Sequence, residues 1–189
     1  MDSEAEEESV TGITVKAFIL ARLLDLAKEK LSPDELAKLE ADLGVQHRLL
    51  KVAFFSDHPV ELQIKLEERL APVVWGRCDD QAFYLFGRQN FETFAASAVG
   101  RTMLALTGKD PKRIVMTSLG ILSRVMNGAQ IEVVDRGPRD VSFRFRNNPY
   151  RPLGWQGVID ATLEHAGVKP KVQLVQHGGG DTEYLISWE

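Results

Sequence analysis

Hydrophobic residues recur every three or four positions through roughly the first two thirds of the chain, which is the spacing of an α-helix. The broadest apolar stripe, Val15–Leu31, covers most of the circumference of its predicted helix. A second helix is predicted from Ser32, because Ser32 can cap it, Pro33 fits its first turn and Glu35 completes a capping box. The same spacing predicts three further helices, over residues 57–71, 79–106 and 110–126.

The hydrophobic period changes from 3.6 to 2 near residue 130. Ile131 and Val133 alternate with polar residues, and Phe143 and Phe145 alternate with arginines, which predicts a β-hairpin with one buried and one charged face. A helix around Trp155 and strands over 170–176 and 182–188 follow. About five helices followed by a ββαββ unit indicate the α+β class, with an antiparallel sheet covered on one face.

Composition predicts one compact domain. The chain has 189 residues, of which 44% are hydrophobic and 26% charged, and we expect a single α+β domain over residues 11–189. Residues 1–10 are acidic and are predicted to be a disordered tail, which either solubilises the protein or docks a basic partner. The acids of this tail are Asp2, Glu4, Glu6, Glu7 and Glu8.

Charge and cysteine content narrow the function classes. Acids and bases nearly balance beyond the tail, whereas a nucleic-acid-binding domain would be distinctly basic. Because the sequence begins with acidic residues, we expect no secretory signal. Because no apolar run is long enough, we expect no membrane span. The single cysteine fits a reducing compartment, so we expect a cytoplasmic location.

The residue patterns that usually carry catalysis or metal binding are missing from the sequence. No histidine lies three or four residues from another, so no metal site is predicted, and Asp57 before His58 is expected to cap a helix. Cys78 lies beside Arg77 but has no matching histidine, and no serine lies in a nucleophile elbow. Gly178–Gly180 joins two strands, whereas phosphate loops lead into a helix. We therefore predict no catalytic residues and no enzyme activity.

One basic cluster occurs in the predicted hairpin and after it, where five arginines face a single acid, Asp140. Arginine suits phosphate or carboxylate, so the cluster is a candidate patch for an anionic ligand or a protein partner. Phe143 and Phe145 point to the opposite face, so no stacking platform for bases is formed, and a plain solvated sheet face is the alternative. The arginines are Arg136, Arg139, Arg144, Arg146 and Arg151.

Several short motifs resemble an uncharacterised family of proteins of about this length that is expanded as paralogues in myxobacteria. The resemblance covers about residues 10–189, and the family implies no activity. The motifs are Phe91–Phe94 (FETF), Ala98–Arg101 (AVGR), Lys109–Arg113 (KDPKR), Pro152–Gly157 (PLGWQG) and the closing Tyr184–Trp188 strand.

The order of helices followed by ββαββ is also similar, at the level of fold, to vinyl-reductase-type ligand-binding domains, heme–nitric-oxide-binding domains and transport-particle subunits. That similarity implies a domain that encloses a small apolar ligand or serves as a dimeric scaffold. The heme-binding pattern is missing, because residues 79–126 hold no histidine and the Tyr-x-Ser-x-Arg motif is absent, so no heme is expected. Cys78 is the only candidate for the lipid-carrying cysteine of some transport-particle subunits.

These observations predict a non-enzymatic regulatory or protein-interaction module. The alternative is a small-molecule sensor with an apolar pocket between the helices and the sheet, although a filled core explains the same residues. The candidate pocket residues are Phe83, Phe86, Phe91, Phe94, Met103, Met116 and Trp155.

We also predict a homodimer that forms through the first helix. A surface helix normally buries one stripe, so an edge helix that is apolar on two sides needs a second cover, and a symmetric partner can supply it. The alternative is that this helix is central within one subunit. The candidate interface residues are Phe18, Ile19, Leu23 and Leu26.

Overall fold

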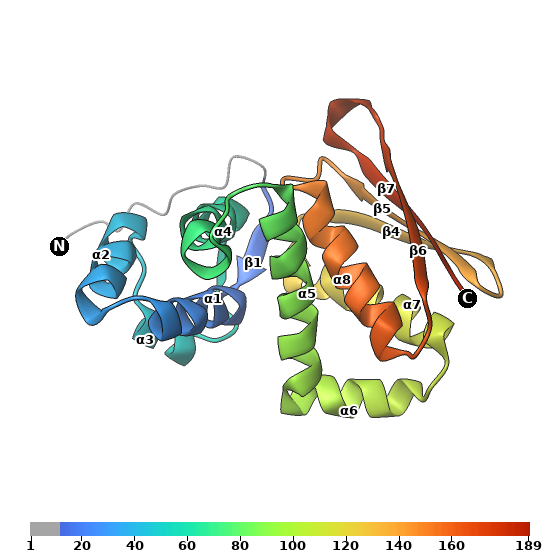
Figure 1. Cartoon of the computed structure of the whole chain (residues 1–189), viewed down its shortest axis with the longest axis horizontal. Helices are drawn as coiled ribbons and strands as arrows, with labels where there is room; N and C mark the ends of the chain where they lie inside the picture. The colour runs from blue at the N-terminus through green and yellow to red at the C-terminus, as the bar shows by residue number, and fades with distance from the viewer. Residues whose placement is uncertain (1–11) are drawn as a thin grey trace. The chain divides into compact units, whose positions relative to one another are not determined.

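The computed structural model describes residues 12–189, with side chains at all of these positions except 99, 123 and 124 (Figure 1). The predicted acidic tail lies outside the described residues. Within residues 12–189, none of the helices is both long and apolar enough to cross a bilayer.

The chain divides into two compact units. The N-terminal unit comprises the residues up to Arg77 together with Val125–Ala129, and the C-terminal unit comprises Cys78–Arg124 and Gln130–Glu189. The two units are defined by how the chain packs. That residues 11–189 fold as a single domain stays a prediction.

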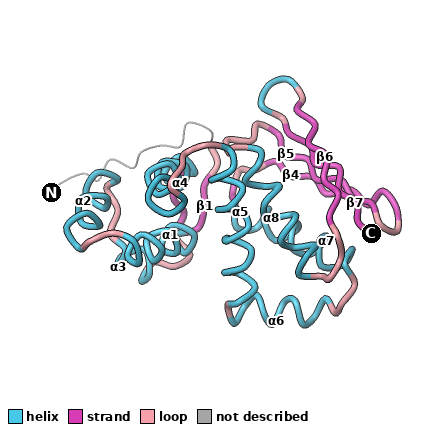
Figure 2. Tube along the Cα trace, in the orientation of Figure 1, coloured by secondary structure: helices cyan, strands magenta, loops and turns pink. Residues whose placement is uncertain are grey.

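The N-terminal unit is mostly helical (Figure 2). Its small antiparallel sheet has the strand order β2-β1-β3. Helix α1 contacts α2, α3, α4 and β1 and is therefore the central helix of this unit. The elements are β1 (Thr14–Lys16), α1 (Ala17–Lys30), α2 (Pro33–Leu43), α3 (His47–Val52), β2 (Asp57–Pro59), α4 (Val60–Trp75) and β3 (Met126–Asn127).

The central position of α1 corrects the expectation that it is an edge helix. Its broad apolar surface is covered by other helices of the same chain, and Leu23, a predicted interface residue, is only 3% exposed. Phe18, Ile19 and Leu26 are partly exposed. A dimer that forms through these three residues stays a prediction.

A local sequence signal explains how α2 begins, whereas strand pairing determines where α4 begins. The predicted capping box of α2 is confirmed, because the Ser32 amide donates to the Glu35 carboxylate at 2.9 Å and the Glu35 amide donates to Ser32 Oγ at 3.4 Å. The helix predicted from residue 57 begins only at Val60, because Asp57–Pro59 pairs with β1 as a strand. Asp57 does not cap a helix, and the prediction for that side chain was wrong.

The C-terminal unit contains a four-stranded antiparallel sheet in the order β4-β5-β7-β6. Helix α8 packs on one face of the sheet, and α5 lies beside α8 (Figure 1). The elements are α5 (Asp80–Ala96), α6 (Ala98–Thr107), α7 (Pro111–Val125), β4 (Gln130–Gly137), β5 (Asp140–Arg146), α8 (Pro152–His165), β6 (Pro170–Gln176), a short 3-10 turn (Gly178–Gly180) and β7 (Thr182–Trp188).

The register of the hairpin confirms the α+β prediction in detail. Ile131 pairs with Phe145 and Val133 with Phe143, so the alternating apolar residues share the face that α8 covers. Phe143 and Phe145 have no exposed surface. The Trp155 ring of α8 lies 5.7 Å and 5.9 Å from the centroids of these two phenylalanine rings.

The helical region has more helices than the five that the sequence predicts. The expected helix over 79–106 is two helices, because Ser97 ends α5 and caps α6 by accepting the Gly100 amide at 2.9 Å. A Cβ atom on Gly100 would lie 1.8 Å from the carbonyl oxygen of Phe94, so this break requires glycine. Helix α3, over His47–Val52, was not predicted.

Glycine also sets the distance between α5 and α8. A Cβ atom on Gly87 would lie 1.9 Å from the Gly154 carbonyl oxygen, and one on Gly157 would lie 2.0 Å from that of Tyr84. The two helices therefore cross in direct backbone contact.

Candidate functional site

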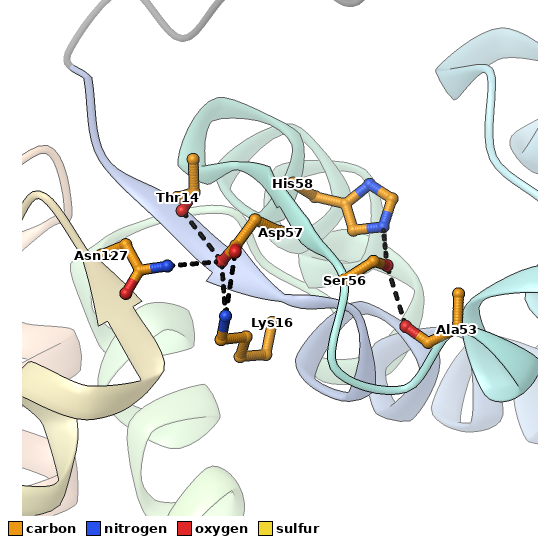
Figure 3. Close-up of polar contacts among 7 residues, drawn as sticks. All are labelled: Thr14, Lys16, Ala53, Ser56, Asp57, His58 and Asn127. Atoms are coloured by element: carbon orange, nitrogen blue, oxygen red, sulfur yellow. Dashed lines mark hydrogen bonds and ion pairs between the residues drawn. The ribbon is translucent and has the colours of Figure 1, made fainter.

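The carboxylate of Asp57 is the centre of a hydrogen-bonded cluster in the N-terminal unit (Figure 3). Its Oδ1 atom accepts hydrogen bonds from Thr14 Oγ1 at 3.1 Å and Asn127 Nδ2 at 2.9 Å. Lys16 Nζ lies 2.9 Å from both carboxylate oxygens, and this contact is the main cause of the lowered pKa of Asp57. The carboxylate thus joins β1, β2 and β3, which is a structural cross-link between segments distant in sequence.

Ser56 and His58 form a second polar contact beside this cluster (Figure 3). Ser56 Oγ donates to the Ala53 carbonyl at 2.8 Å and lies 3.0 Å from His58 Nε2. Because the hydroxyl proton is already donated to Ala53, the imidazole Nε2–H is the donor in the Ser56–His58 contact. Burial lowers the pKa of His58, although the nearby Asp57 charge opposes the shift. This arrangement fixes a turn and is the reverse of the one that activates a serine nucleophile.

A group of exposed apolar side chains lies on α3 and the turn that follows it. We call this group the Phe54 surface; it consists of Leu49, Val52, Phe54 and Phe55, whose exposed fractions are 57%, 80%, 46% and 74%. The Phe54 ring stacks on Phe18 with centroids 5.0 Å apart, and the Phe55 ring meets it edge-on at 5.0 Å. Phe18 of the predicted interface is therefore continuous with a surface that sequence reasoning missed.

Backbone hydrogen bonds hold the Phe54 surface in place. The Ala17 amide donates to the Ser56 carbonyl at 2.9 Å, and the Phe18 amide donates to the Phe54 carbonyl at 3.2 Å. These bonds come from the first turn of α1, where amide groups have no partner within the helix. The aromatic turn is thus tied to the most buried helix of the unit.

The border of the Phe54 surface is basic. Arg48 and Lys51 are exposed on α3, and no acidic residue occurs between positions 46 and 56. Lys51 Nζ lies 2.7 Å from Asp25 Oδ1, which compensates one of the two charges. The run of apolar residues from Leu49 to Phe55, interrupted by one lysine, marks an apolar segment in the sequence, but it does not tell whether that segment is buried or exposed.

A second polar cluster connects α5 and α8 in the C-terminal unit. Tyr84 donates to Asp160 Oδ2 at 3.0 Å, and Arg88 binds both carboxylate oxygens of Glu164, at 3.1 Å and 2.5 Å. Burial raises the pKa of Asp160, whereas hydrogen bonding from Arg88 lowers the pKa of Glu164. Each carboxylate already has a donor from α5, so the cluster clamps the glycine crossing. Tyr84 and Arg88 are four residues apart on α5, and Asp160 and Glu164 are four residues apart on α8, so each pair shares one face of its helix. This spacing was the signal in the sequence.

The predicted pocket residues do not share one environment. Four of them, Phe83, Phe86, Phe91 and Trp155, are buried, which is where the filled-core interpretation places them. Phe94, Met103 and Met116 are partly exposed. A ligand pocket between helices and sheet therefore stays a prediction.

The five predicted arginines are not gathered into one patch. Arg136 lies near the end of β4 and Arg139 in the turn that follows, whereas Arg144 and Arg146 lie on the outer face of β5. Arg151 precedes α8, where it bonds Asp80 at 3.2 Å and covers the Phe83 ring at 4.6 Å. Arg144 is bound to Asp181 at 2.9 Å. A patch of these arginines for an anionic ligand or a protein partner stays a prediction.

The histidines and the cysteine are also scattered. His47 lies 2.9 Å from Asp25, the His165 ring meets Phe91 edge-on, and His177 Nε2 lies 3.0 Å from Glu183. Cys78 is exposed. Among residues 12–189, no three histidine, cysteine, aspartate or glutamate side chains are grouped as metal ligands would be.

Solved structures similar to this chain are H-NOX proteins. An H-NOX protein from K. algicida is 15% identical, with a TM-score of 0.64, over 92% of this chain and 96% of the other. An H-NOX mutant from T. Tengcongensis is 12% identical, with a TM-score of 0.65, over 92% and 97%. A structure from work on heme distortion in the H-NOX family is 13% identical, with a TM-score of 0.64, over 92% and 95%. The fold is therefore H-NOX-like, which confirms the fold-level resemblance.

The side chains of helices α5–α7 do not fit the axial ligation of a heme. Heme iron in proteins is held by His, Cys or Tyr, or by Met together with His. Helices α5–α7 contain no histidine or cysteine, and their one tyrosine, Tyr84, is bonded to Asp160. Only the thioethers of Met103 and Met116 remain as donors on these helices.

Comparison by sequence identifies the family. None of the curated proteins matches this sequence. Residues 52–189, which are most of the chain and include the whole C-terminal unit, match the family described as Protein of unknown function (DUF2378). The chain therefore belongs to the DUF2378 family.

Proposed function

We propose that this protein is a non-enzymatic protein-interaction module that contacts a partner protein through the Phe54 surface. The observation that carries the proposal is the exposure of four large apolar side chains within seven residues, Leu49–Phe55. Exposed apolar patches on soluble proteins commonly mark interaction sites, and aromatic residues are enriched at protein interfaces.

The rigidity of the surface supports binding. Phe54 and Phe55 stand on a turn that is tied to α1 by two backbone hydrogen bonds, and their rings contact each other and Phe18. A side chain that is already ordered loses less conformational entropy on association. The surface is thus pre-organised for a partner.

The charge at the border defines the chemistry of that partner. Arg48 is exposed at the edge of the Phe54 surface, whereas Lys51 is paired with Asp25 at 2.7 Å. Complementary charge steers association and selects partners. We expect a partner protein with an apolar groove bordered by carboxylates.

The polar clusters support a role without catalysis. Asp57, Asp160 and Glu164 are each bonded to donors from the same chain, and the Ser56 proton is donated to a carbonyl. A cytoplasmic location, also proposed here, agrees with the single exposed cysteine.

A binding comparison tests this proposal. The full chain, the double variant Val52→Ser/Phe55→Ser and the control Ala37→Ser are immobilised and exposed to extract of the source cells. We expect one protein that the wild type and the control retain and the double variant does not, with equal melting temperatures because all three sites are exposed. Identical retention by all three proteins would refute the proposal.

A small-molecule sensor is the second candidate, and the H-NOX-like fold favours it. The ligand would not be heme, because α5–α7 lack a suitable axial donor. We expect no Soret band after expression with added heme. Native mass spectrometry of the purified chain tests the sensor, which requires a stoichiometric mass increase from a copurified small molecule.

A further inference from the structure

Strand β4 forms one edge of the four-stranded sheet and pairs only with β5. Among the described residues, no backbone group of positions 130–136 bonds to the backbone of any other segment. About half of the N–H and C=O groups of an antiparallel edge strand point away from its single neighbour. The outer edge of β4 therefore presents a row of unpaired donors and acceptors.

The two edges of this sheet differ in their protection. The opposite edge strand, β6, begins with Pro170, which has no N–H, and Lys171, and both residues are typical of edges that avoid further pairing. Strand β4 is eight residues long and contains neither proline nor lysine. Its one register shift, between Asp135 and Gly137, lies at the end that leads into the turn. The shift falls at Arg136, which has no partner on β5, so residues 130–135 form the regular part of this edge.

The side chains on the outer face of β4 are, in order, an acid, a valine and a base. Glu132, Val134 and Arg136 share this face, and Val134 is 40% exposed. Arg136 lies with Lys171 and Ser187 around a shallow depression on the same face, and only a 4.0 Å contact joins it to Asp140. An acid and a base therefore flank a central exposed valine on this edge, and the base, Arg136, lies at the bulge that ends its regular part.

We propose that β4 pairs antiparallel with β4 of a second copy of this chain, with Val134 at the centre. A twofold axis normal to the sheet keeps the outer face of both copies on the same side. Val134 then lies opposite its own counterpart, and Glu132 of each copy lies opposite Arg136 of the other. Directly opposed residues of antiparallel strands interact, so this register gains two pairs of opposite charge.

Neighbouring registers of the two β4 strands do not place Glu132 opposite Arg136. Centring the pair on Asp135 places two aspartates opposite each other, and centring it on Val133 places Glu132 opposite Val134. A slip by a single position would put outward residues opposite inward ones, which the pleat forbids. In the proposed register, Asp135 of one copy lies opposite Val133 of the other on the inner face. The charge of Asp135 stays compensated by Lys112 of its own chain, 2.6 Å away.

This pairing gives the homodimer expected from the sequence a different interface. It lies in the C-terminal unit, whereas the Phe54 surface lies in the N-terminal unit. The inference therefore does not depend on the proposed function.

Charge reversal tests the register. Molar mass is measured by analytical ultracentrifugation on the full chain from micromolar to hundreds of micromolar. We expect the wild type to approach twice the mass of the 21.1 kDa chain as concentration rises. Glu132→Arg and Arg136→Glu should each stay monomeric, because like charges then face each other. An equimolar mixture of the two variants should form the dimer again, because each supplies the charge that the other lacks.

Two controls separate the possible failures. Arg139→Glu reverses an exposed charge in the neighbouring turn and should leave the dimer unchanged, as should Phe55→Ser on the Phe54 surface. Melting curves of all variants check folding, and recovery of the dimer in the mixture shows that both single variants are folded. A wild type that stays monomeric, or single variants that still form dimers, would overturn the pairing. Loss of the dimer in Phe55→Ser alone would also overturn it and would place self-association on the Phe54 surface.

Discussion

Two clusters of aromatic rings in this molecule make similar ring contacts but differ in their exposure. In the C-terminal unit, Phe143 lies 5.6 Å from the Tyr184 ring and 5.7 Å from Trp155, and both Phe143 and Tyr184 are fully buried. In the N-terminal unit, Phe54 makes 5.0 Å contacts to Phe18 and Phe55, but Phe55 is mostly exposed. The same residue type therefore supports folding in one cluster and is free to support association in the other.

The largest expected effect contrasts these two clusters directly. Phe145→Ala should lower the free energy of unfolding by about 3–5 kcal/mol, because it removes a fully buried ring from a packed core. Phe55→Ala should change it by no more than about 0.5 kcal/mol. Urea denaturation of the two variants measures both values, and equal losses would mean that Phe55 is a core residue.

Arg144 provides a matched control within the sheet. It lies between Phe143 and Phe145 on β5, faces outward and makes a partly exposed contact with Asp181. Arg144→Ala should therefore cost at most about 1 kcal/mol. A loss as large as that of Phe145→Ala would show that the register of β5 is wrong.

The next effect tests the backbone contact that supports the buried cluster. Gly87→Ala should destabilise the protein by about 1–3 kcal/mol or more, because the added methyl group meets the Gly154 carbonyl. Gly120→Ala on α7 is the matched control, since a Cβ atom there meets no other atom within 4 Å. That change should be neutral or stabilising by up to about 1 kcal/mol. Thermal melts of the pair decide the point, and similar melting temperatures would argue against direct contact of α5 and α8.

A smaller effect concerns the cross-link in the N-terminal unit. Asp57→Asn should cost about 1–2 kcal/mol at neutral pH, because it removes the charge that Lys16 binds while keeping the shape of the side chain. Chemical denaturation at pH 7 measures the loss. An unchanged midpoint would mean that the cluster adds nothing to stability.

The acid dependence of the same variant has a defined sign. The pKa of Asp57 is lower in the folded protein than its ordinary value, so its contribution is present above the unfolded pKa of about 4. The contribution is lost as the pH falls through the folded pKa. Wild type and Asp57→Asn should therefore differ in stability at neutral pH and converge in acid, and a constant difference would contradict the assignment.

The elements with local signals could be predicted from the sequence. The capping box at Ser32, the alternation that places Phe143 inward and the final two strands each depend on residues that are close in the chain. The secondary structure of these segments is therefore determined by intrinsic propensity, by capping and by the alternation of apolar and polar residues.

The features that were missed depend on contacts distant in sequence. Asp57 looks like a helix cap until Lys16 and Asn127 are brought to it by strand pairing. The apolar circumference of α1 is typical of both an edge helix in a dimer and a central helix in one chain. Only the positions of α2, α3 and α4 distinguish the two cases.

The candidate surface was missed for a related reason. Residues 45–56 are too short and too irregular for a helical period, so α3 and its aromatic turn gave no element to analyse. Nothing in the local pattern tells whether Phe54 and Phe55 are buried or exposed. Their exposure follows from the backbone bonds that draw the turn to the start of α1.

Photo-crosslinking tests the role of the Phe54 surface most directly. A photoreactive phenylalanine derivative replaces Phe55 in the full chain expressed in the source cells, with the same group at the exposed position Ala37 as control. We expect one crosslinked protein partner from position 55 and none from position 37. Crosslinks from position 55 to lipid alone, or equal crosslinking from both positions, would contradict it.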